Sequence, residues 1–151
     1  YIINLQHYLH YNNIGNGVKR VMYAMTDQKQ WEGRIDSTTN TSSFRLHQKV
    51  KRIPINDVSA SDNQRAAIVG FICDEGVRRN QGRIGAASGP NALRASLSSL
   101  PWTFTEEQQV IDVGNILCLN HALEDAQSEL GGIVQTLLTK KMSMCCAWWW
   151  A

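Results

Sequence analysis

The chain has 151 residues, and its 15 Lys and Arg nearly balance its 13 Asp and Glu, which gives a formal net charge of +2. This length is typical of one domain with a sizeable core, and the near balance of charge argues against a nucleic-acid partner or an anionic membrane surface. No apolar run reaches the roughly 18 residues that a membrane-spanning helix needs. Four cysteines do not indicate a disulfide framework at this size, so we expect a reducing, cytoplasmic location.

The two ends of the chain differ in composition from its middle. Residues 1–24 contain no acidic residue and many Tyr, Asn and His, which predicts a disordered or non-native extension. They also lack the basic start and apolar block of a secretory signal. At the other end, three of the five Trp stand together at 148–150, directly after Cys145-Cys146-Ala147. Such a cluster is an unusual end for a soluble domain.

The next features in chain order predict a strand, a loop and a helix. Residues 66–72 form a continuous apolar run, which is typical of a strand buried on both faces of a parallel sheet. A loop rich in Gly and Arg follows over 74–90, and Gly89-Pro90 opens a helix that ends near residue 100. We expect the apolar side of this helix to consist of Ala92, Leu93, Ala95 and Leu97.

The remaining part of the chain repeats the pattern of strand and helix. Residues 110–114 predict a second strand, an amphipathic helix is expected over about 121–140, and a third strand is expected within 142–147. This order indicates right-handed crossovers and a parallel α/β sheet within residues 25–144. The expected buried face of the long helix consists of Leu123, Ala126, Leu130, Ile133, Val134, Leu137 and Leu138.

Loop 74–90 is the best candidate for a binding site, because ligands of open α/β sheets bind beyond the carboxyl ends of the strands. Its arginines can form two-pronged hydrogen bonds to a carboxylate or a phosphate. The alternative is a packed structural loop in which Asp74 and Glu75 pair with those arginines. Neither the Rossmann nor the Walker glycine spacing is present, so nucleotide binding is not indicated. The cysteine pair and the isolated histidines, among them His47 and His121, do not indicate a metal site.

At this loop the sequence resembles the formimidoylglutamase family of the arginase/agmatinase ureohydrolase superfamily. The resemblance covers about residues 25–141 and is most specific in the loop, Asp74-Glu75-Gly76-Val77-Arg78-Arg79-Asn80-x-Gly82-Arg83-x-Gly85-Ala86-x-x-Gly89-Pro90. Further matching motifs are Trp31-x-Gly33-Arg34-x-Asp36, Leu46-His47-Gln48, Gly70-Phe71, Asp112-x-Gly114-Asn115 and the helix with Leu123, Gln127 and Leu130.

The resemblance implies a three-layer α/β/α arginase-like fold with a parallel sheet, present here only as its N-terminal part. It implies an enzyme with two Mn²⁺ ions, in which a metal-bridging hydroxide attacks N-formimidoyl-L-glutamate to give L-glutamate and formamide in histidine degradation. The metal motifs of the family, Gly-Gly-Gly-His-Glu, Asp-x-His-x-Asp and Asp-x-Asp, are absent, so we expect no catalytic or metal-binding residue here and an inactive chain. The residues that we expect to receive the substrate carboxylates, or to brace the loop that does, are Arg78, Arg79, Asn80, Gly82 and Arg83.

The resemblance also suggests an explanation for the Trp cluster. Trp has the single codon TGG, so Trp148-Trp149-Trp150-Ala151 followed by an assumed TGA stop codon is encoded by TGG TGG TGG GCN TGA. Read one base later, this string becomes GGT GGT GGG CNT GA, which encodes three Gly, then His if N is A, then Glu or Asp. We therefore expect 145–151 to be a frameshifted tail that replaces the first metal motif. Two alternatives are a small α/β anion-binding or regulatory module that uses loop 74–90, and a non-functional pseudogene product. The expected partner is the small-molecule substrate, and we expect neither a nucleic acid nor a membrane as a partner. A homo-oligomer is one possible state of the intact enzyme.

Overall fold

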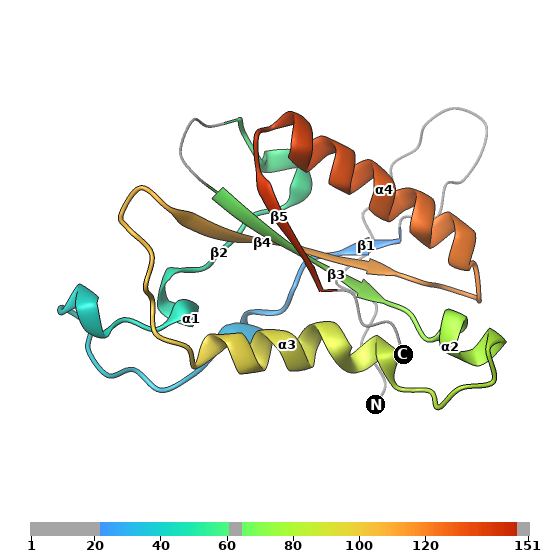
Figure 1. Cartoon of the computed structure of the whole chain (residues 1–151), viewed down its shortest axis with the longest axis horizontal. Helices are drawn as coiled ribbons and strands as arrows, with labels where there is room; N and C mark the ends of the chain where they lie inside the picture. Colours follow the sequence, from blue (N-terminus) through green and yellow to red (C-terminus); the bar gives the residue numbers. More distant parts are fainter. Residues whose placement is uncertain (1–21, 61–64, 148–151) are drawn as a thin grey trace.

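The computed structural model describes residues 22–60 and 65–147 of the chain (Figure 1). The strands are β1 (Tyr23–Ala24), β2 (Lys51–Arg52), β3 (Arg65–Ile72), β4 (Gln109–Leu117) and β5 (Ser143–Ala147). The α-helices are α1 (Leu46–Lys49), α2 (Glu75–Arg79), α3 (Gly89–Ser98) and α4 (Leu123–Thr139), and short 3-10 helices lie at Gln28–Trp31, Thr41–Ser43, Ile55–Asp57 and Ala86–Ser88.

The five strands form one mixed sheet in which β3 lies between β4 and β5 and is parallel to both. The other edge of β4 carries two short strands. β1 pairs with it in antiparallel fashion at Asn115 and Ile116, and β2 pairs with it in parallel at Ile111 and Asp112. The long parallel strands are therefore in the centre, as the unbroken apolar runs predict.

The two long helices cover opposite faces of the sheet. The chain moves from β3 through α3 to β4, and then from β4 through α4 to β5 on the other side of β3. The crossover from β3 to β4 and the crossover from β4 to β5 run in opposite directions across the sheet. Because both crossovers are right-handed, α3 and α4 lie on opposite faces, as Figure 1 shows. Ala67 and Ile111 pack in the core under α4, whereas Ile68 and Val110 pack with Trp31 on the α3 side. The predicted three-layer α/β fold is confirmed.

A β-bulge in β4 interrupts this regular alternation. Ile68 of β3 pairs with Asp112 and Gly70 pairs with Asn115, so β4 uses one residue more than β3 over the same length. The backbone at Gly114 has a φ of 91°, a value that glycine adopts easily. Asp112 and Asn115 are three residues apart, and in a regular strand this spacing would place their side chains on opposite faces. The bulge instead lets Asp112 and Asn115 both reach the α3 side.

The strands and helices expected from the sequence agree closely with those observed. The strand predicted at 66–72 is β3, the strand at 110–114 continues to residue 117 beyond the bulge, and the third strand is β5. The helix predicted over 121–140 is α4, although Leu138 is 58% exposed and does not join its buried face. The buried residues of α4 are Ala126, Leu130, Ile133 and Leu137.

The predicted apolar side of α3 is wrong. Leu93 is 40% exposed, and Ala92 and Ala95 are exposed as well. The buried face consists of Pro90, Arg94 and Ser98, which follow one another at intervals of four residues, with Leu97 half-buried beside them. The physical reason is that a fully hydrogen-bonded arginine can be buried, so polarity alone did not reveal which side faces the sheet.

The expected domain boundaries fall mostly outside the described residues. Of the extension expected over 1–24, only residues 22–24 are described, and Met22 is buried in the core under α4. Of the tail expected over 145–151, only 145–147 are described, as the end of β5. Within the described ranges, no helix has the length and apolarity needed to cross a membrane.

The close packing around Gly70 gives a stability prediction. A Cβ at this position would lie 2.1 Å from Asn115 Oδ1 and 2.9 Å from the Cβ of Pro90, so Gly70→Ala forces the packing of α3 against the sheet to shift. We expect a loss of about 1–3 kcal/mol in the free energy of unfolding, measured by urea denaturation. Gly131→Ala is the matched control, because nothing lies within 4 Å of its added Cβ, and it should gain roughly 0.5–1 kcal/mol in helix stability. Equal stability of the two variants would contradict the packing.

Candidate functional site

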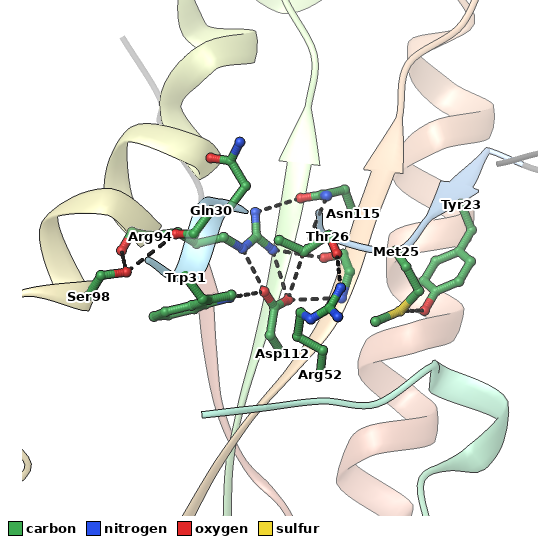
Figure 2. Close-up of polar contacts among 11 residues, drawn as sticks. Tyr23, Met25, Thr26, Gln30, Trp31, Arg52, Arg94, Ser98, Asp112 and Asn115 are labelled. Atoms are coloured by element: carbon green, nitrogen blue, oxygen red, sulfur yellow. Dashed lines mark hydrogen bonds and ion pairs between the residues drawn. The ribbon is translucent and has the colours of Figure 1, made fainter. Parts of the chain in front are cut away.

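The most buried polar group of the fold is an ion pair between α3 and β4 (Figure 2). Arg94 Nε and Nη2 donate to the two carboxylate oxygens of Asp112 at 2.8 and 2.9 Å, and both side chains are completely buried. Nη1 donates to Asn115 Oδ1 at 2.7 Å, and Nη2 also reaches the carbonyl oxygen of Gly114 at 3.1 Å. This fork-to-fork geometry holds α3 in a fixed position against the bulge of β4.

The same carboxylate also holds the N-terminal part of the described chain. Trp31 Nε1 donates to Asp112 Oδ2 at 2.6 Å, and Thr26 Oγ1 donates to Oδ1 at 3.1 Å. The backbone N–H of Gly114 completes the set at 2.9 Å. We call Thr26, Trp31, Arg94, Asp112 and Asn115 the arginine hub. Its members are all buried and bonded to one another, so the hub braces the fold.

The short motifs near the start of the fold are also structural. The ring of His47 packs against Gly33, where an added Cβ would lie 3.0 Å from Nδ1, and that nitrogen is 2.8 Å from the carbonyl oxygen of Ser98 in α3. Asp36 binds Arg45 at 2.6 Å, and the Arg34 and Arg45 guanidinium groups keep the pKa of this carboxyl below its usual value. These contacts fasten the segment before β2 to the end of α3.

Loop 74–90 begins at the carboxyl end of β3, as predicted, and Asp74 closes it on itself. Oδ1 of Asp74 accepts the backbone N–H groups of Gly85 at 3.0 Å and Ala87 at 2.9 Å. The expected pairing of Asp74 with an arginine is therefore not what this side chain does. Asp74 instead joins the start of the loop to backbone groups 11 and 13 residues later in the chain.

Glu75 is the centre of the polar cluster in this loop. Its side chain is only 4% exposed, and it receives Arg78 Nη2 at 2.6 Å and Arg79 Nε at 2.9 Å. These residues are three and four positions apart on α2, which brings their side chains to one face. His121 Nδ1 lies 2.8 Å from Glu75 Oε2, and Arg79 continues to Glu124 at 3.2 Å. We call these five residues the glutamate cluster.

The pairing changes the protonation of the glutamate cluster. Hydrogen bonds, first of all from Arg78 and then from Arg79 and His121, lower the pKa of Glu75 to about 2. The hydrogen bond from Arg79 lowers the pKa of Glu124, and the two carboxylates raise the pKa of Arg79. The two carboxylates and the two guanidinium groups of the cluster therefore stay charged at neutral pH, with opposite signs adjacent.

The five residues expected to bind substrate divide into two groups. Arg78 and Arg79 point their charges at Glu75, as the structural alternative for this loop predicts. Asn80, Gly82 and Arg83 lie in the exposed part of the loop, and within residues 22–60 and 65–147 Arg83 makes no ion pair. The structure thus brings Arg78 and Arg79 together and leaves Arg83 with its guanidinium open to solvent. The role of all five in binding stays a prediction.

Sequence reasoning missed the arginine hub and the partners that Glu75 and Arg79 find outside the loop. A signal for the hub was available, because Asp112 lies inside a strand predicted for a parallel sheet. Such strands are buried on both faces, and a buried carboxylate needs a cation. Nothing in the sequence pairs His121 with Glu75 or Glu124 with Arg79, since 46 and 45 residues separate them.

The described residues also bear on metal binding. Among them, no group of three or more His, Cys, Asp or Glu side chains is arranged to hold a metal ion. A groove of about 500 Å³ lies at the other end of β4, lined by Lys49, Lys51, Trp102, Phe104 and neighbours. It is at the amino end of the parallel strands, away from loop 74–90.

Breaking the arginine hub should be strongly destabilising. Asp112→Asn keeps the shape of the side chain but leaves the Arg94 charge buried without its counter-charge. We expect a loss of about 3–5 kcal/mol in the free energy of unfolding by urea denaturation. Asp36→Asn removes the carboxylate of a more exposed pair and should have a much smaller effect. Similar losses in the two variants would contradict the role of the hub.

The lowered pKa of Glu75 predicts a specific pH dependence of stability. The folded pKa lies below the ordinary value of about 4.5, so the stabilisation is complete above pH 4.5 and is lost as pH falls toward 2. The difference in unfolding free energy between the wild type and Glu75→Gln should thus be constant from pH 7 to 5 and shrink below that. Glu124→Gln, at a 70% exposed side chain, is the control and should show a weaker trend. A difference that stays constant down to pH 2.5 would rule out this account.

Comparison with known proteins identifies the relatives of this chain. No protein-family profile matches it. A formimidoylglutamase of Lysinibacillus sphaericus is 80% identical over 121 residues, which are 80% of this chain and 38% of that protein. The formimidoylglutamase of Geobacillus kaustophilus is 43% identical over 81% of the chain and 38% of its own length, and that of Clostridium tetani is 41% identical over 79% and 36%.

These relatives share one name, and the chain spans little more than a third of the length of each. The confirmed α/β fold with parallel strands is consistent with part of an arginase-like fold. The chain therefore matches an N-terminal fragment of the formimidoylglutamase family.

Proposed function

We propose that the chain is part of a cytoplasmic hydrolase that converts N-formimidoyl-L-glutamate to L-glutamate and formamide in histidine degradation. The observation that carries this proposal is the 80% identity to a formimidoylglutamase over 121 residues. That stretch is long enough to include the arginine hub and the glutamate cluster. No feature of the described residues favours an independent anion-binding module over this function.

A pair of Mn²⁺ ions belongs to the proposed enzyme, but the described residues do not fit such a centre. No three carboxylate, imidazole or thiol groups converge among them, and the acidic side chains of loop 74–90 are occupied. Asp74 binds two backbone N–H groups, and Glu75 binds two arginines. We therefore derive no catalytic step from a metal here and assign the metal ligands to the part of the enzyme that this chain does not span.

In this proposal the role of the fragment is to shape one side of the substrate site. Substrates of parallel α/β sheets lie beyond the carboxyl ends of the strands, and loop 74–90 leaves the sheet there. Arg78 and Arg79 brace the loop through Glu75. Asn80 and Arg83 occupy its exposed part, and a guanidinium open to solvent is suited to receive a carboxylate of the substrate.

A chimera tests the function and the fragment together. We replace the matching segment of the Lysinibacillus sphaericus formimidoylglutamase with the 121 aligned residues of this chain and measure formamide release from N-formimidoyl-L-glutamate. We expect activity close to that of the unaltered relative, because the transplanted segment is 80% identical to the one that it replaces. A folded chimera without activity, checked by its cooperative unfolding, would contradict the proposal.

Within the active chimera, Arg83→Ala should raise KM about tenfold with little change in kcat, since one charged hydrogen-bonded contact contributes about 1.4 kcal/mol or more. Arg83→Lys keeps the charge and should recover part of the affinity. Arg34→Ala removes an exposed arginine from the start of the fold and serves as the control. An unchanged KM for Arg83→Ala would exclude this residue from substrate binding.

A further inference from the structure

Two cysteines lie side by side where the central strands end. Ile72, the last residue of β3, pairs with Leu117, the last residue of β4, so Cys73 and Cys118 are the next residues on adjacent parallel chains. The backbone pairing continues past the strands, because the N–H of Cys118 donates to the carbonyl oxygen of Ile72 at 3.0 Å. By strand alternation both side chains point to the α4 face, on which Phe71 and Ile116 pack.

The two side chains are neighbours on one face where the central strands end, and both are free thiols in the structure. The backbone N–H of Glu75 donates to Cys73 Sγ at 3.4 Å. Burial, followed by the contact with Cys73, raises the pKa of Cys118 to about 12. The Cys118 thiol therefore keeps its proton at neutral pH.

The backbone spacing suits a covalent bond between them. Adjacent strands lie about 4.8 Å apart, and the Cα atoms of a disulfide are usually separated by roughly 4.4–6.8 Å. Both residues are half-buried, so each keeps some solvent-exposed surface in the folded chain. Neither cysteine takes part in the proposed function.

We propose that Cys73 and Cys118 form a redox-active dithiol that a low-molecular-weight disulfide oxidises to an intramolecular disulfide. The Cys73 thiolate attacks one sulfur of the small disulfide and releases one small thiolate. Cys118 gives its proton to that thiolate and attacks the Cys73 sulfur, which releases the second small thiolate. This thiolate takes up the proton that Cys73 lost on ionisation. Two protein thiols are oxidised to one disulfide, and one small disulfide is reduced to two thiols.

The bond would link the starting points of the two loops that make the glutamate cluster. Cys73 directly precedes Asp74 and Glu75, and Cys118 lies three residues before His121. His121 contacts Glu75 at 2.8 Å, so the dithiol and the glutamate cluster share one end of the sheet. Oxidation therefore restrains loop 74–90 at its origin, and the folded state gains stability from the cross-link.

Peptide mapping of the whole chain tests the proposal without any assay of enzyme activity. The chain is equilibrated with mixtures of oxidised and reduced glutathione, quenched with acid, alkylated and digested. We expect a Cys73–Cys118 cross-linked peptide that increases with the oxidised fraction, saturates, and disappears on return to reduced glutathione. The melting temperature of the oxidised chain should exceed that of the reduced chain.

The controls separate this bond from other thiol chemistry. Cys118→Ser should abolish the cross-link and the rise in melting temperature, whereas Cys145→Ser with Cys146→Ser should leave both unchanged. Full alkylation of Cys73 and Cys118 at every glutathione ratio would overturn the proposal, and so would disulfides that join them only to glutathione or to Cys145 and Cys146. Mapping of the wild-type chain decides the question even where a serine variant does not fold.

Discussion

The buried ion pair between Arg94 and Asp112 is the interaction on which the rest of this fold depends. A charge pair removed from water is tolerated only where every donor and acceptor is matched, and here the match needs three separate parts of the chain. The bulge at Gly114 turns Asn115 to the same side as Asp112, and Trp31 brings the N-terminal segment to the same carboxylate. Helix, sheet and N-terminal segment thus share one electrostatic centre.

The second polar group has a different character because of where it lies. The arginine hub is sealed beneath α3, whereas the glutamate cluster lies at the carboxyl end of the sheet and combines a buried carboxylate with exposed cations. Glu75 joins its own helix, loop 74–90 and the start of α4 through Arg79 and His121. The fold therefore buries the central carboxylate of each group, whereas Arg83, the remaining arginine of the loop, is exposed.

Much of the fold could be predicted from the sequence, and the failures have a common cause. The apolar run at 66–72, the apolar residues around Asp112 in 110–114 and the periodicity of α4 revealed the central strands and the long helix, because burial there is mainly hydrophobic. The buried side of α3 was predicted wrongly, since it is carried by Arg94 and depends on a residue 18 positions away. In the loop, the pairing of Glu75 with arginines was foreseen as an alternative, but its contact with His121 joins distant segments and has no local signal.

The pair of two-residue strands beside β4 has a consequence for association between chains. A nine-residue strand with one open edge would offer its unpaired N–H and C=O groups as a template for another chain. β1 and β2 cover two stretches of that edge in opposite directions, and β2 carries the exposed cations Lys51 and Arg52. Short, oppositely directed and charged strands are poor partners for further pairing, so this side of the sheet is protected against edge-to-edge aggregation.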